Sequence, residues 1–226
     1  MSIYRHALGA DFDRLHPRMQ ERFGYDSTTG IAHVGTGVMR RITRAPLLAR
    51  PFLRFGTLRN LLFPEHGTDV PFTVANYAYR DRFGRETITW HRTFDFGDRV
   101  RCFDATMIWS ERRGSIIDYL GTHQHLATDL RCWVDAEGGI NFAADEQRFV
   151  DPLLQIRCPR WFGGEARVRE WYDDELDRFR IRVAVSNQLL GPIFGYEGDF
   201  TVECIPVDDA EQIPAAVLPR REVAAE

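Results

Sequence analysis

The chain has 226 residues, of which 44% are hydrophobic and 27% charged, so it can bury a core of its own without disulfides or metal ions. All 29 cationic side chains are arginine, and the lack of lysine excludes lysine Schiff-base chemistry and a P-loop lysine. The formal net charge of −4 argues against general nucleic-acid binding, which favours a basic domain.

The N-terminal part of the chain is predicted to contain helices on either side of one strand. Residues 2–23 read as two short helices, the second starting at Pro17, and residues 29–43 as a bent strand. Residues 46–62 read as an arginine-rich amphipathic helix, which Pro51 kinks or restarts. Its apolar side chains follow helical spacing, and we favour docking of this apolar face on the sheet. The apolar face consists of Leu48, Phe52, Phe55, Leu58 and Leu62.

The remainder of the chain reads as short strands separated by turns. The expected strands cover residues 70–79, 87–96, 99–110, 116–134 with a bend at Gly121, 140–150, 166–172, 178–187 and 193–205. Strands in hairpin order form antiparallel sheets, and a sheet of this size curls or closes. We therefore expect a single α+β domain over residues 1–205, a β-rich antiparallel curved sheet or partial barrel with N-terminal helices. Residues 206–226 are expected to be disordered.

The expected compartment follows from what the sequence lacks. The N-terminus has no apolar signal core, and no run of 18 uncharged apolar residues occurs. We therefore expect a cytoplasmic protein. No G-x-G-x-x-G motif follows a strand, and no C-x-x-C pair occurs, so we expect no cofactor.

Four short motifs carry a family resemblance. They are Tyr4-Arg-x-Ala-Leu-Gly9, Trp90-x-Arg92-x-Phe94, Gly138-Gly139 and Leu190-Gly-Pro-Ile-Phe-Gly-Tyr196-x-Gly198. With them, residues 4–205 resemble the uncharacterised bacterial family called domain of unknown function 4166. The resemblance implies a bacterial domain without an established activity. The family is seen alone and as an extra domain beside Rossmann-type oxidoreductase modules, so the resemblance implies a domain that acts alone or serves an oxidoreductase partner.

Arg92 is the first candidate site residue. Alternation along residues 87–96 puts it on an apolar face with Trp90 and Phe94. A buried guanidinium needs a partner, and it could clamp a carboxylate or phosphate on a ligand. We favour the other reading, a structural ion pair with Asp118 or Glu86.

Asp118 lies on the mostly apolar face of residues 116–134 and is a candidate general acid or base with a raised pKa. The favoured alternative is again an ion pair with Arg92 or another inward arginine.

His123 and His125, with Asp129, share strand parity, so they could hold one metal ion. We favour a non-metal role, because such a pair arises easily by chance in a chain with seven histidines.

The stretch of residues 27–64 contains six arginines and no acidic residue. The 46–62 helix could therefore act at a membrane surface or as a lid over the barrel mouth. We favour a docked helix with solvated or paired arginines, so a membrane partner is the less favoured reading.

Together these patterns favour binding of a small, mostly apolar molecule that carries a polar or anionic group. We expect it in a barrel-like cavity lined by Trp90, Arg92, Phe94, Asp118 and Tyr196. The alternative is an enzyme in the same cavity, a cyclase, isomerase or hydrolase. It would use general acid–base chemistry with Asp118, or a metal held by His123, His125 and Asp129.

Overall fold

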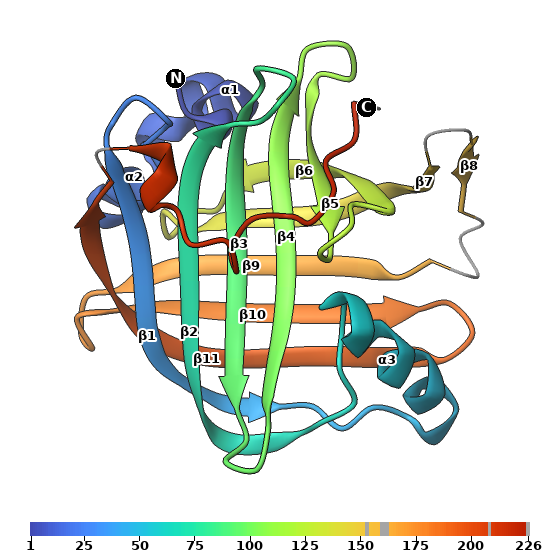
Figure 1. Cartoon of the computed structure of the whole chain (residues 1–226). Helices are drawn as coiled ribbons and strands as arrows, with labels where there is room; N and C mark the ends of the chain where they lie inside the picture. The colour runs from blue at the N-terminus through green and yellow to red at the C-terminus, as the bar shows by residue number, and fades with distance from the viewer. Residues whose placement is uncertain (152–153, 159–162, 208, 225–226) are drawn as a thin grey trace.

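The computed structural model describes residues 1–151, 154–158, 163–207 and 209–224 (Figure 1). Its helices and 3-10 turns are α1 (Ile3–Leu8), η1 (Gly9–Arg14), α2 (Pro17–Phe23), η2 (Leu47–Ala49), α3 (Arg50–Gly56), η3 (Thr57–Arg59) and η4 (Ala210–Gln212). Its strands are β1 (Ile31–Ile42), β2 (Gly67–Arg80), β3 (Glu86–Asp95), β4 (Val100–Ser110), β5 (Ser115–Leu120), β6 (Leu126–Val134), β7 (Ile140–Asp151), β8 (Leu154–Arg157), β9 (Glu165–Asp173), β10 (Arg178–Asn187) and β11 (Gly191–Pro206).

The strands form a closed antiparallel barrel. They pair in the order β6-β5-β4-β3-β2-β1-β11-β10-β9-β7-β8, and an additional β6–β7 pairing joins the two sides. Ten strands therefore close on themselves, and β8 is an edge strand outside the ring, paired to β7. Figure 1 shows β1–β4 crossing steeply over β9–β11, so that the barrel has two walls. The predicted curved sheet is confirmed, and closure makes it a complete barrel.

The expected single strand over residues 116–134 is wrong. The chain turns back between β5 and β6, with positive φ angles of 73° at Gly121 and 53° at Gln124. Asp118 lies directly opposite Thr128 in the resulting hairpin. Even-numbered residues on both strands therefore share the inner face, which is the face that alternation had predicted for Asp118.

The N-terminal helices cover one end of the barrel. Pro17 occupies the first turn of α2, as predicted, and Ser2 Oγ accepts a hydrogen bond from the Tyr4 backbone N–H. Tyr4 packs edge-on against Phe23 with ring centroids 4.8 Å apart, and Trp90 Nε1 donates to Tyr4 Oη over 2.8 Å. These aromatic contacts give the helices an apolar base and close this end to solvent.

The 46–62 segment is helical as predicted, but the favoured docking of its apolar face on the sheet is wrong. Residues 47–59, here called the α3 cap, turn Ala49, Leu53 and Gly56 toward the barrel. Leu48 and Phe55 of the predicted face are exposed. Ala49 and Leu53 are buried in the main core cluster, and Ala49 and Gly56 line the interior cavity.

The segment after residue 206 was expected to be disordered, whereas its described residues pack on the outside of the barrel (Figure 1). Val223 N–H donates to Gln124 Oε1 over 2.9 Å, and the side chain of Val223 is buried. Tyr79 Oη donates to Glu222 over 3.0 Å. These contacts hold the segment over β2 to β5. Within the described residues, no helix has the length and apolar character needed to cross a bilayer.

Candidate functional site

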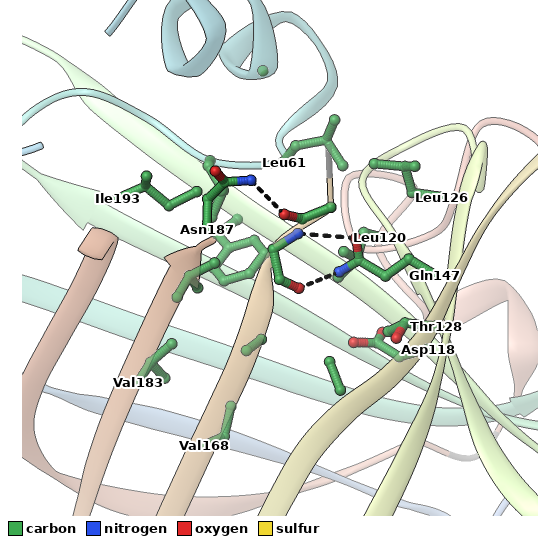
Figure 2. A pocket seen from close by; sticks show the side chains of 18 of the residues that line it. Leu61, Asp118, Leu120, Leu126, Thr128, Gln147, Val168, Val183, Asn187 and Ile193 are labelled. Atoms are coloured by element: carbon green, nitrogen blue, oxygen red, sulfur yellow. Dashed lines mark hydrogen bonds between the residues drawn. The ribbon is translucent and has the colours of Figure 1, made fainter. Parts of the chain in front are cut away.

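A cavity of about 380 Å³ lies inside the barrel, beneath the α3 cap. Its size falls in the range of small-molecule sites. The wall is mainly aliphatic and aromatic and draws on both sides of the barrel (Figure 2). Lining side chains include Phe103, Met107, Leu120, Leu130, Phe142, Val168, Val183 and Ile193. Polar side chains in this wall are few, so each of them bears on what the cavity can bind.

Arg92 and Trp90 both line the cavity from β3. The Arg92 guanidinium is buried, donates from Nε to the carbonyl of Phe103 over 3.1 Å, and reaches Tyr196 Oη at 3.3 Å. It also lies 3.8 Å from the Phe103 ring centroid. Among the described residues, no carboxylate lies within ion-pair distance of it. The favoured ion pair with Asp118 or Glu86 is therefore wrong, and Glu86 instead accepts from Ser27.

Asp118 also lines the cavity, beside Thr128 (Figure 2). Asp118 Oδ1 and Thr128 Oγ1 are both buried and, among the described residues, neither has a hydrogen-bond partner. Burial raises the pKa of Asp118 to about 7, against a smaller lowering by the charge of Arg92. A carboxyl group that titrates near neutral pH can donate a hydrogen bond to a ligand or exchange a proton with it.

Two amides organise the rim of the cavity (Figure 2). Gln147 donates to the Gly164 carbonyl over 2.5 Å and accepts from the Gly164 N–H over 3.1 Å. Asn187 donates to the Gly163 carbonyl over 2.7 Å and accepts from the Leu189 N–H over 2.9 Å. The amides thus tie residues 163–164 and the β10–β11 turn to the barrel, and their polar groups are largely satisfied.

Phe94 and Tyr196, also predicted to line the cavity, lie beside it. Phe94 is fully buried among other rings, with its centroid 4.9 Å from that of Phe63 and 5.1 Å from that of Tyr196. Tyr196 is buried as well and reaches the site through its hydroxyl, which contacts Arg92. Tyr196 therefore orients the guanidinium from behind the cavity wall.

His123 and His125 lie in the β5–β6 connection, outside the cavity lining. Their rings are stacked with centroids 6.0 Å apart, and Arg221 approaches His125 Nδ1 to 2.9 Å. Asp129 is held elsewhere, by Arg113 and by Arg148 at 2.8 Å. In the part of the chain that the structure describes, no three His, Cys, Asp or Glu side chains gather closely enough to hold a metal ion.

A buried ion pair inside the barrel was missed by the sequence analysis. Arg22 of α2 donates to Glu170 of β9 and, over 3.2 Å, to Asn76 Oδ1. Both charged side chains are buried, and desolvation raises the pKa of Glu170. Glu170 shares the inward parity of Val168, so alternation along β9 places its side chain on the inner face. The pair therefore joins helix α2 to strand β9 of the barrel.

The Asp118 carboxyl is expected to make stability depend on pH. Its pKa rises from 3.8 to about 7 on folding, so the folded state binds this proton more tightly. Its contribution is fully present below the unfolded pKa and is lost as the pH rises to about 7, at roughly 1.4 kcal/mol per pH unit. Asp118→Asn should therefore gain stability relative to the parent protein across this window. Urea unfolding at a series of pH values measures the unfolding free energy of both proteins. Equal pH dependence of this free energy in the two proteins would contradict the prediction.

The fold and the cavity define the class of the protein: a closed antiparallel β-barrel with an apolar interior pocket and a helical cap over it.

The chain belongs to the family described as domain of unknown function (DUF4166), whose model matches residues 15–200. A relative in Bacillus subtilis (strain 168), described as uncharacterized protein YndH, is 32% identical over 202 residues, which cover 89% of this chain and 97% of YndH. The predicted resemblance is thus confirmed over most of the barrel.

Proposed function

We propose that the protein binds a small, mostly apolar molecule with an anionic group, most simply a carboxylate, inside the barrel. The apolar part would lie against the aliphatic wall and the anionic group against Arg92. The single observation that carries the proposal is the buried Arg92 guanidinium at the cavity wall, which has no carboxylate partner among the described residues.

The electrostatics of the cavity support an anion. The charge of Arg92 acts at longer range on the Asp118 and Glu170 carboxyl groups. Among the described residues no carboxylate forms an ion pair with it, and a ligand carboxylate would supply one with charge-assisted hydrogen bonds. The neighbouring Asp118 does not compete strongly, because burial raises its pKa to about 7. A bound anion would raise this pKa further and keep Asp118 protonated, as a hydrogen-bond donor.

A second candidate function is general acid–base catalysis in the same cavity. The pKa of Asp118, near 7, favours it, because catalytic acids and bases work best when they titrate near the operating pH. Such an enzyme would isomerise, cyclise or hydrolyse the bound molecule, with Asp118 moving the proton and Arg92 holding the anionic group. Turnover that depends on Asp118 would distinguish this function from simple binding.

A comparison of two probe ligands tests the binding proposal. Decanoate and decanol share an alkyl chain and differ in the carboxylate. We expect decanoate to bind more tightly by at least about tenfold in isothermal titration calorimetry, because charge-assisted hydrogen bonds are worth roughly 1.5–3 kcal/mol. Native mass spectrometry of the protein as purified should show a bound mass that organic extraction removes. Equal affinity for the two probes would contradict the proposed anionic group.

A further inference from the structure

The α3 cap, residues 47–59, exposes large apolar side chains at the mouth of the cavity. Leu47, Leu48, Phe55 and Leu58 have exposed fractions of 71–81%. Leu189, in the β10–β11 turn, is 73% exposed and also lines the cavity. Soluble monomers seldom expose a contiguous apolar patch of this kind unless something binds to it.

The cap is apolar on two opposite faces. Ala49, Leu53 and Gly56 point toward the barrel, three and four residues apart. Leu48, Phe55 and Leu58 follow the same helical spacing on the outward side. An amphipathic surface helix normally buries its apolar side chains, so the exposed Leu48, Phe55 and Leu58 call for a cover over the outer face.

The charge around this face indicates what covers it. Arg50, Arg54 and Arg59 belong to the cap, and Arg44 precedes it. Among the described residues, none of the four has a carboxylate partner, and Arg44 donates only to His66 Nε2, over 2.9 Å. Many arginines elsewhere in the described residues pair with a carboxylate, as in the Arg101–Glu65 pair at 2.6 Å. The patch therefore joins exposed leucine and phenylalanine to unneutralised positive charge.

We propose that the outer face of the α3 cap docks the barrel on an anionic lipid bilayer. A protruding helix suits the headgroup region, where Leu and Phe side chains insert and arginines reach lipid phosphates. The cap's inner residues Ala49 and Gly56 line the cavity, so docking brings the cavity mouth to the bilayer surface. An apolar ligand could then enter from the lipid without crossing water. The docking itself does not depend on which ligand the cavity takes.

Vesicle co-sedimentation of the full chain tests the proposal. We expect binding to vesicles of phosphatidylglycerol and phosphatidylcholine in equal parts, weaker binding at high salt, and little binding to phosphatidylcholine alone. The double variant Leu48→Gln, Phe55→Gln should bind at least about tenfold more weakly, because both side chains leave the apolar layer. Arg54→Gln should weaken binding to the anionic vesicles by about fivefold.

Leu176→Gln is the matched control, because Leu176 is exposed in the β9–β10 turn, away from the cap. This variant should bind anionic vesicles like the parent protein. Absence of binding to anionic vesicles at low salt would overturn the proposal. Light scattering tests whether a second copy of the chain binds this face instead. If the protein is a dimer that the Leu48 and Phe55 substitutions dissociate, and it does not bind vesicles, the face belongs to a second copy and the proposal is overturned. Unchanged binding by the Leu48→Gln, Phe55→Gln variant would also overturn it.

Discussion

Arg22→Met is expected to lower the free energy of unfolding by about 3–5 kcal/mol, because it leaves the buried Glu170 carboxyl without its cation. The loss should be smaller at mildly acidic pH. Desolvation already raises the pKa of Glu170, and removing Arg22, which lowers it, would raise it further. Because this raised pKa belongs to the folded state, its stabilising contribution is lost as the pH rises. Urea unfolding at two pH values measures both effects.

Two further variants separate the pair from the helix that carries it. The double variant Arg22→Met, Glu170→Leu removes both charges and should recover much of the loss, because apolar replacements of buried pairs are often neutral or better. Arg18→Met, on the same helix, breaks an exposed pair with Glu21 and should cost less than about 1 kcal/mol. Equal losses of unfolding free energy for Arg22→Met and Arg18→Met would show that the buried pair stabilises the fold no more than the exposed pair.

Arg92→Met is expected to weaken decanoate binding by at least about thirtyfold while leaving decanol binding nearly unchanged, because it removes the cation that faces the ligand carboxylate. The fold should survive, since no carboxylate among the described residues loses its partner. Titration calorimetry with both probes measures the contrast, and thermal unfolding checks the fold.

The companion variants are Arg92→Gln and Tyr196→Phe. Arg92→Gln keeps a side-chain donor near the Phe103 carbonyl and serves if the methionine variant is unstable. Tyr196→Phe removes one contact to the guanidinium without removing its charge, so its effect on decanoate binding should be smaller. Decanoate affinity that survives the loss of Arg92 would mean that the anion lies elsewhere or that the cavity does not take one.

The inward direction of Arg92 and Asp118 could be read from the sequence. Alternation along one strand depends only on the backbone pleat, so both residues are on the inner face as expected. The same pattern would have placed Glu170 and Asn187 inward. The sequence did not predict which of these groups contact each other, because Arg22 and Glu170, for example, are 148 positions apart in the chain.

The exposed face of the α3 cap shows what helical periodicity could not predict. The helical spacing of Leu48, Phe55 and Leu58 was visible, and hydrophobicity alone favoured burying them. Ala49 and Leu53 are buried in the core instead, leaving Leu48, Phe55 and Leu58 to solvent. Periodicity identifies an apolar face, but the shape of the surface beneath decides which face is buried.

Local patterns were therefore enough for most of the strands, their antiparallel hairpin order, the chemistry that a lysine-free chain excludes, and the side of the sheet that Arg92 and Asp118 face. These properties depend on neighbours within a few positions. Local patterns were not enough for the turn between β5 and β6 or for β8. Closure of the ring by the β1–β11 pairing, the cavity, and the absence of a carboxylate within ion-pair distance of Arg92 among the described residues depend on distances between segments far apart in the chain. Such distances are set by the packing of the whole barrel, which is why only the three-dimensional arrangement could turn an inward arginine into a candidate anion site.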